Sequence, residues 1–344
     1  MASPVIGIGW HLLGAVMAAT FYVPIERARK WAWETTWAFS GIFSWILLPI
    51  CVSLALLPDF FGFYAAAGWP LMIRIALFGA LWGVGNVTYG LTVRYLGLSL
   101  GIGVAIGITL TVGTLLPPLM HGQAALLFAT RSGLISMAGV LVSLIGVALV
   151  SWAGHQKERQ RQGNLQEFNV KTGVIAAILC GFTSSGMSFG IDAAKPLEQT
   201  ALHLGVNPLY AALPAYVLIM GGGVLVNWGY CFFRLATVKD ISFVADMHQP
   251  LSTSARNLLL AATGGVMWYL QFFFYAWGAA NIPQRLSYVN WMLHMSCYVL
   301  CGGVVGLALG EWKGVSTRPT RILCFGIVVI IVAANIVGIG MSGN

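Results

Sequence analysis

The chain has 344 residues, of which 58% are hydrophobic and only 8% are charged, and its formal net charge is +8. A soluble domain carries about a quarter charged residues, so this composition excludes a water-soluble fold. The basic residues lie in short loops between apolar runs, a pattern that the positive-inside rule explains better than nucleic-acid binding does.

The apolar runs are roughly 20 residues long, which is the length that crosses a hydrocarbon core as a helix. The first run lacks a basic segment and a cleavage site, so we expect a membrane span and not a signal peptide. The sequence therefore predicts an all-α integral membrane protein with ten transmembrane helices. In chain order these are residues 4–24, 37–57, 70–93, 96–118, 133–152, 172–194, 208–232, 257–281, 286–309 and 320–341.

The basic residues predict the orientation of the chain. If the N-terminus is outside, 14 of the 18 basic residues fall in loops on the cytoplasmic side. These are Arg27, Arg29, Lys30, Arg94, Lys157, Arg159, Arg161, Lys171, Arg234, Lys239, Arg256, Lys313, Arg318 and Arg321. This asymmetry predicts that both termini are periplasmic.

A polar stretch at residues 155–169 divides the ten spans into two sets of five. An odd number of spans in each half places the second half upside down, which predicts a 5+5 inverted repeat. The expected division is a first five-helix repeat at 1–154, a cytoplasmic linker at 155–171 and a second repeat at 172–344. A shift of 186 residues matches Trp82 with Trp268 and Tyr89 with Tyr275, although chance matches are frequent in apolar sequence.

Two spans carry an amide between aromatic rings. In the eighth span Trp268, Gln271 and Tyr275 recur at helical spacing and share one face, and the third span repeats this pattern with Trp82, Asn86 and Tyr89. Amides bond sugar hydroxyls and rings cover the apolar face of a sugar. The alternative is ordinary helix packing. The predicted substrate-binding set is Gln271, Asn86, Trp268, Tyr89, Tyr275, Trp82, Asn290 and Trp291.

His11 and His294 lie at similar depths in the first and ninth spans. Histidine titrates near neutral pH and can carry a coupling proton, while the alternative is a histidine satisfied by a carbonyl. Glu34, at the start of the second span, is the third candidate; a simple pairing with Arg27, Arg29 and Lys30 is the alternative. Asp192 and Lys195 are expected to form an ion pair at i, i+3.

No cofactor and no metal is expected. The six cysteines contain no CxxC pair and are interpreted as buried free thiols. No phosphate-binding loop and no hydrolase or metalloprotease motif occurs, so the sequence predicts neither ATP-driven transport nor an enzyme.

The chain resembles the L-rhamnose–proton symporter family of the drug/metabolite transporter superfamily. The segments that carry the likeness run from end to end and include GWHLLGA, WAWETTW, LWGVGNVTYGLTVRYLG, GIGVAIGITLTVGT, GMSFGIDAAKP, GGVMWYLQFFFYAWG, WMLHMSCYVLCGG and VVIIVAANIVGIG. The resemblance implies proton-driven uptake of L-rhamnose, and of related sugars such as L-lyxose or L-mannose, across the bacterial inner membrane. An exporter of amino acids or other small metabolites on the same fold is the alternative.

The chain departs from that family's pattern at two positions. Family members carry an acid near the start of the ninth span, where this chain has Ser287, and an amide where it has Asp192. Coupling is therefore assigned to neither position, and His11, His294 and Glu34 remain the candidates.

Overall fold

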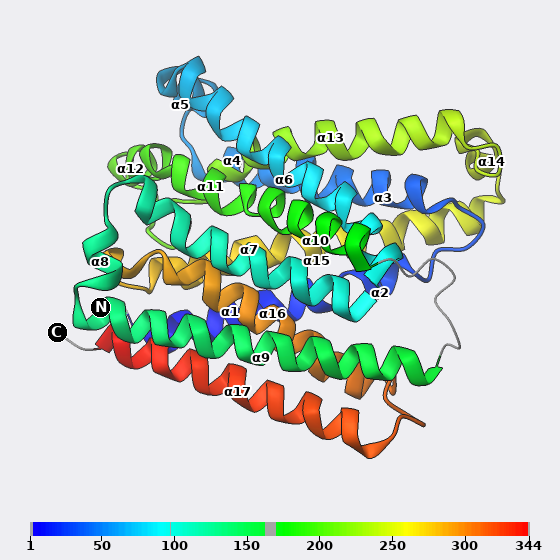
Figure 1. Cartoon of the computed structure of the whole chain (residues 1–344). Helices are drawn as coiled ribbons and strands as arrows, with labels where there is room; N and C mark the ends of the chain where they lie inside the picture. The colour runs from blue at the N-terminus through cyan, green and yellow to red at the C-terminus, as the bar shows by residue number, and fades with distance from the viewer. Residues whose placement is uncertain (1–2, 97, 162–169, 343–344) are drawn as a thin grey trace.

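The computed structural model describes residues 3–96, 98–161 and 170–342. In this part of the chain ten helical segments are long and apolar enough to cross a membrane, and no strand is present. The prediction of an all-α membrane protein with ten spans is confirmed. The start of α1 and the end of α17 lie at the same end of the bundle (Figure 1). We call this the terminal end and the opposite end the linker end.

Two of the first five spans are interrupted, and short helices lie in two of the turns between these spans. In chain order the elements are α1 (Pro4–Thr20), α2 (Tyr22–Ile25), α3 (Trp33–Gly41), the π-helix η1 (Ile42–Leu47), α4 (Leu48–Leu56), α5 (Phe60–Ala67), α6 (Trp69–Leu96), α7 (Leu98–Met120), α8 (Ala124–Phe128) and α9 (Arg131–Arg161). The helix α9 continues to Arg161, so the first residues of the expected linker are helical.

The last five spans begin with a helix in three pieces. The elements are α10 (Val170–Ser184), α11 (Gly186–Ala193), α12 (Lys195–His203), α13 (Ala215–Thr237), α14 (Phe243–Met247), α15 (Leu251–Ala280), the 3-10 turn η2 (Gln284–Leu286), α16 (Val289–Ala308) and α17 (Thr317–Ser342). The seventh span begins at Ala215 and not at the expected residue 208. Pro208 and Pro214 explain this, because proline cannot donate to a helical hydrogen bond.

Proline also marks the irregular turns within spans. Pro49 is the second residue of α4, just after η1. It has no N–H for the carbonyl four residues earlier, so the wider π-turn absorbs the missing bond. Pro196 stands at the start of α12, and Ala194 between α11 and α12 has φ −87° and ψ 0°, outside the helical region. The sixth span is therefore broken at the terminal end, next to the site described below.

Glycine lets α6 and α13 cross at backbone contact. A Cβ on Gly79 would lie 1.8 Å from the carbonyl oxygen of Ile219, and a Cβ on Gly222 would lie 1.8 Å from that of Ala76. No other residue fits at either position. Small residues at close crossings are the usual means of packing helices in lipid.

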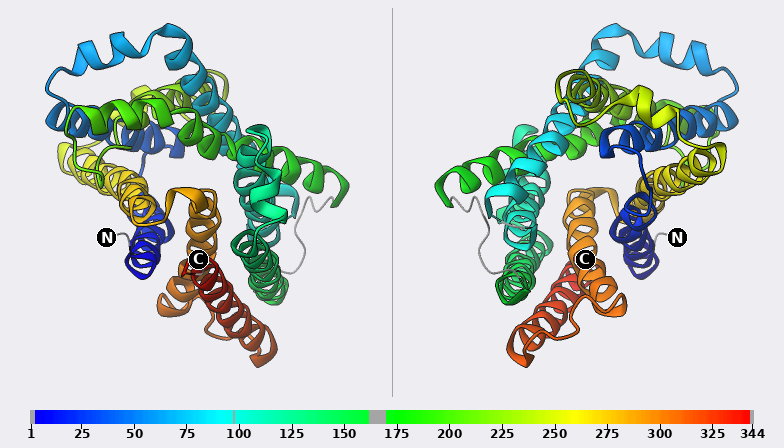
Figure 2. Two further views of the ribbon diagram at one scale, coloured as in Figure 1. Left: turned by 90° about the vertical axis from the view of Figure 1, so that its left-hand side faces the viewer. Right: turned by 90° about the vertical axis from the view of Figure 1, so that its right-hand side faces the viewer.

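Helices of one half of the chain pack mainly against helices of the other half. The first span, α1, packs against α15 and α16, and the sixth span, α10, packs against α6 and α7. A shift of five spans converts one set of neighbours into the other, and α9 pairs with its counterpart α17. Figure 2 shows the bundle from its two ends, with most of these helices seen along their axes.

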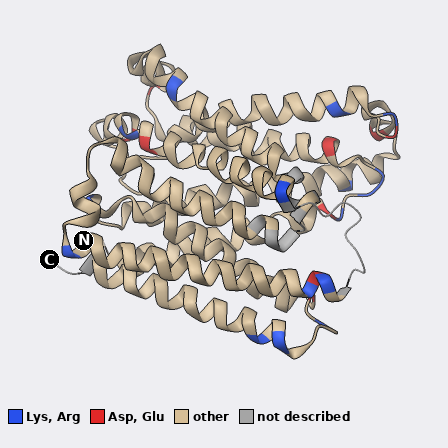
Figure 3. Cartoon of the chain, viewed as in Figure 1, with Lys and Arg blue, Asp and Glu red and all other residues tan. Residues whose placement is uncertain are grey.

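Charged side chains lie at the two ends of the bundle, and the apolar middle is nearly free of them (Figure 3). Most of the lysines and arginines in the figure are at the linker end. This distribution agrees with ten helices that cross a hydrocarbon layer.

Candidate functional site

A cavity of about 340 Å³ lies at the terminal end of the bundle. Its walls come from α7, α11, α12, α13, α15, η2 and α16, so both halves of the chain contribute. Ligand sites in transporters tend to lie between such halves, at broken helices. The break between α11 and α12 forms part of this wall.

The cavity floor carries three of the eight residues predicted to bind substrate: Tyr275, Asn290 and Trp291. All three are at most 5% exposed. The ring centroids of Tyr275 and Trp291 are 6.2 Å apart, and the angle between the ring planes is 68°. Trp291 Nε1 donates to the carbonyl of Thr109 at 3.0 Å, which ties α16 to α7. The floor thus offers an amide between two rings.

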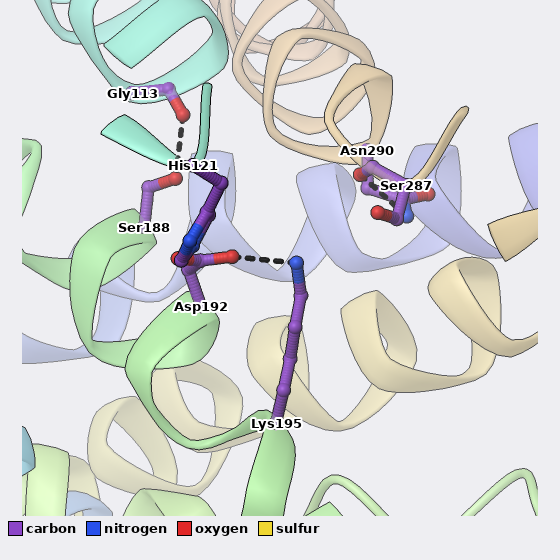
Figure 4. Close-up of polar contacts among 7 residues, drawn as sticks. All are labelled: Gly113, His121, Ser188, Asp192, Lys195, Ser287 and Asn290. Atoms are coloured by element: carbon purple, nitrogen blue, oxygen red, sulfur yellow. Dashed lines mark hydrogen bonds and ion pairs between the residues drawn. The ribbon is translucent and has the colours of Figure 1, made fainter. Parts of the chain in front are cut away.

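Asn290 connects the cavity floor to His11. The Asn290 Nδ2 donates to the Ser287 carbonyl at 3.0 Å (Figure 4), and its Oδ1 lies 3.0 Å from His11 Nε2. Because an amide oxygen only accepts, His11 Nε2 is the protonated nitrogen in this contact. The histidine therefore holds the amide of Asn290 in one orientation.

The two predicted histidines are brought together behind the floor. Their ring centroids are 5.9 Å apart, and each packs edge-on against Tyr275, at 5.1 Å for His11 and 5.3 Å for His294. Both are completely buried and neither lines the cavity. Neither nitrogen of His294 has a hydrogen-bond partner among the described residues.

The other five predicted substrate residues do not line the cavity. Gln271 and Trp268 lie four and seven residues before Tyr275 on α15, about 6–10 Å closer to the linker end. The Trp82 and Trp268 rings are stacked at 6.4 Å and 15°, and Phe21 packs on Trp268 at 4.5 Å. The structure therefore separates the sequence-predicted set into a cavity group and a deeper ring cluster.

Asn86 and Tyr89 lie further along α6 toward the linker end, and neither reaches the cavity. The amide nitrogens of Asn86 and Gln271 are buried and have no partner within the described ranges. Such groups are rare in native structures and usually mark a functional region or a water.

Glu34 lies at the linker end, away from the cavity. Arg234 Nε donates to Glu34 Oε1 at 3.1 Å, joining α3 to α13. The sequence suggested Arg27, Arg29 and Lys30 as its partners; the partner in the structure is a residue 200 positions away. The approach of α3 and α13, which the sequence does not reveal, accounts for the difference.

Charged residues occupy the cavity wall opposite Asn290 (Figure 4). Asp192 Oδ1 accepts from Lys195 Nζ at 2.5 Å, which confirms the expected i, i+3 pair. Asp192 Oδ2 lies 2.7 Å from His121 Nε2, and His121 follows directly on α7. His121 is not among the site residues predicted from the sequence. Its place after Pro117 and Pro118, at the end of a span, is the signal that could have indicated it.

One turn deeper on α11, Ser188 donates to the carbonyl of Gly113 at 2.6 Å. Further polar side chains on the wall that the sequence analysis missed are Glu198, Tyr216, Gln284 and Arg285. No group of three metal-ligating side chains is found in the described part of the chain. The cavity therefore offers hydrogen-bonding and charged groups around an aromatic floor, a chemistry suited to a small polyhydroxyl ligand.

Known proteins resemble this chain along its whole length. The family model described as L-rhamnose-proton symport protein matches residues 1–343. A Cronobacter sakazakii protein named L-rhamnose-proton symporter is 56% identical over 338 residues, with 98% of each chain covered. Relatives of the same name in Shigella flexneri and Escherichia coli are 55% identical over 336 residues, also with 98% of each chain covered.

Proposed function

Because the chain belongs to the L-rhamnose-proton symport protein family, a family of transporters and not of enzymes, we propose that it takes up L-rhamnose together with protons across the bacterial inner membrane. The main structural support for this proposal is the cavity. Its volume of about 340 Å³ is at the small end of ligand pockets, which suits a monosaccharide. L-Lyxose and L-mannose are the related sugars we expect it to accept.

L-Rhamnose binds on the cavity floor in this proposal. The Tyr275 and Trp291 rings cover the apolar face of the sugar, and Asn290 and Ser188 bond its hydroxyls. In this proposal the sugar meets a deeper part of the path after the cavity closes behind it. This deeper part consists of Trp82, Trp268, Gln271, Asn86 and Tyr89.

The coupling proton has three candidates from the sequence, and the contacts favour His11 among them. Its bond to Asn290 connects a titratable group directly to the floor. His294 lacks such a bond, and Glu34 lies at the other end, paired with Arg234. We therefore place the coupling of sugar and proton movement at His11.

The cavity faces the periplasm in this proposal, and both termini lie on that side. The linker end, with 14 of the 18 basic residues by sequence, then faces the cytoplasm. A cysteine placed at Gln156, near the end of α9, should resist impermeant thiol reagents in whole cells. Labelling there from outside would reverse the orientation.

The two halves, 1–154 and 172–344, act as inverted repeats on either side of the 155–171 linker. The exchanged helix pairings support this, because α1 meets α15 and α16 as α10 meets α6 and α7. Alternating access then consists of one half rocking against the other around a fixed site.

Proton movement on sugar addition tests the function. De-energised cells that express the protein should alkalinise their medium when L-rhamnose is added, and cells without it should not. Sugar entry without alkalinisation would make the protein a facilitator. Sugar-independent efflux of amino acids would favour the exporter alternative.

A further inference from the structure

The completely buried His11 and His294 leave open how a proton enters from the periplasm. A proton that arrives from outer water must first meet a titratable group in the cavity. His121 is such a group: its side chain is 53% exposed, and its Nε2 lies 2.7 Å from the Asp192 carboxylate. Histidine ordinarily changes its charge between about pH 5 and pH 8.

We propose that His121, with Asp192 as its counter-charge, takes up a proton from the periplasm and thereby controls the affinity for the sugar. This inference rests on the function and orientation proposed above. It adds a proton-binding site at the cavity mouth to the deeper coupling role of His11, which operates only after the floor rearranges.

The link between proton and sugar runs through Lys195. With His121 neutral, Lys195 is the cation that pairs with Asp192 among the described residues, its Nζ bonded to Oδ1 at 2.5 Å. Nε2 of the neutral ring donates to Asp192 Oδ2, so a proton from outer water adds to Nδ1, and the imidazolium and Asp192 then form a second ion pair. The two cations contact different oxygens of Asp192, so the imidazolium shares the carboxylate charge and weakens the pairing with Lys195. The ammonium of Lys195, on its flexible four-carbon stem, then turns to donate to sugar hydroxyls in the same cavity.

The other groups that face this cluster are few. Glu198 stands one turn after Lys195 on α12, and Arg285 reaches the cavity from η2. The phenols of Tyr216, Tyr275 and Tyr288 face the same cavity from α13, α15 and the start of α16. Among the described residues that line the cavity, His121 is the one histidine.

The test measures L-rhamnose affinity of the purified, full-length protein from pH 5.5 to pH 8.5. Wild type should bind more weakly as the pH rises, with Kd increasing by up to about tenfold per pH unit, since one proton is linked to the sugar. His121→Gln should bind weakly with Kd constant within about twofold over the range, because Lys195 stays on Asp192.

Asp192→Asn should also lose the pH dependence, but with affinity close to that of wild type at low pH, because Lys195 is free throughout. His203→Gln is the matched control. His203 ends α12 at the same end of the bundle, is exposed and does not line the cavity, so this variant should keep the wild-type slope. His121→Gln or Asp192→Asn with the wild-type slope would overturn the proposal.

A readout without sugar separates this proposal from the proposed function. If wild type bound no L-rhamnose at any pH, the proposed function would fail, and the imidazole NMR signal absent from His121→Gln would decide the proton site. Movement of that signal across the pH range, altered by Asp192→Asn, supports the proton site. A signal that stays constant overturns it.

Discussion

The terminal end of the bundle encloses a cavity, whereas the same helices are sealed together toward the linker end. At the terminal end His121, Asp192 and Lys195 face open space. Toward the linker end the rings of Trp82 and Trp268 stack between the helices. The comparison indicates that one access path is open and the other is closed. In the orientation proposed above, this is an outward-facing state.

Hydrogen bonds reinforce the sealed end. The Asp246 carboxylate accepts from the Ala32 amide at 3.0 Å and from Thr35 Oγ1 at 2.6 Å. The amide of Asn257 both accepts from and donates to the backbone of Arg29, at 3.1 and 2.7 Å. These contacts hold the α2–α3 connection against α14 and α15, so opening this end requires several bonds to break together.

The boundary between the two regions is the His11–Asn290 contact, and the largest effect is expected there. His11→Gln should abolish uphill accumulation of L-rhamnose while sparing binding and exchange, because glutamine bonds Asn290 but carries no proton at physiological pH. Counterflow and accumulation assays in vesicles measure this. Normal accumulation by both His11→Gln and His294→Gln would remove the histidines from coupling.

The two amides on either side of the boundary should differ in sugar binding. Asn290→Ala should weaken L-rhamnose binding about tenfold or more, since a lost hydrogen bond in a buried site costs on the order of 1–3 kcal/mol. Gln271→Ala, below the floor, should change the affinity less and the transport rate more. Asn281→Ala, at the end of α15 and outside the cavity, is the control for calorimetry. Equal losses for Asn290 and Gln271 would merge the two regions into one site.

Packing at the boundary should depend on Gly278. A Cβ there would lie 2.8 Å from His11 Nε2, and His11 has no room to retreat because it is fully buried. Gly278→Ala should therefore destabilise the protein by about 1–3 kcal/mol, seen as a lower Tm. Gly9→Ala, with no neighbour within 4 Å, should leave the Tm unchanged or slightly raised. Similar Tm values for the two variants would contradict the packing described here.

The smallest effect is expected from the ion pair at the sealed end. Arg234 is 40% exposed, so a double-mutant cycle of Glu34→Ala and Arg234→Ala should give a coupling of about 0.2–1 kcal/mol. The seal would then come mainly from the ring cluster. A coupling above about 3 kcal/mol would instead assign the seal to a desolvated charge pair.

The spans were predictable because the bilayer imposes length and apolarity on each of them. Helical spacing places Tyr275 and Gln271 on one face of α15, yet only Tyr275 lines the cavity. Spacing along a helix does not show how far into the bundle a cavity extends. His121 was missed because it lies outside the apolar runs and its partner is 71 residues away. Arg234 was missed as the partner of Glu34 for the same reason: such contacts depend on helix packing.

Cysteine accessibility at the cavity tests the account most directly. Ala279 lines the cavity from the end of α15, so Ala279→Cys in a background without the six native cysteines places one thiol there. The account predicts labelling by an impermeant thiol reagent in whole cells, and protection by L-rhamnose but not by D-glucose. No labelling from outside, or labelling that L-rhamnose leaves unchanged, would contradict a periplasmic sugar site in this cavity.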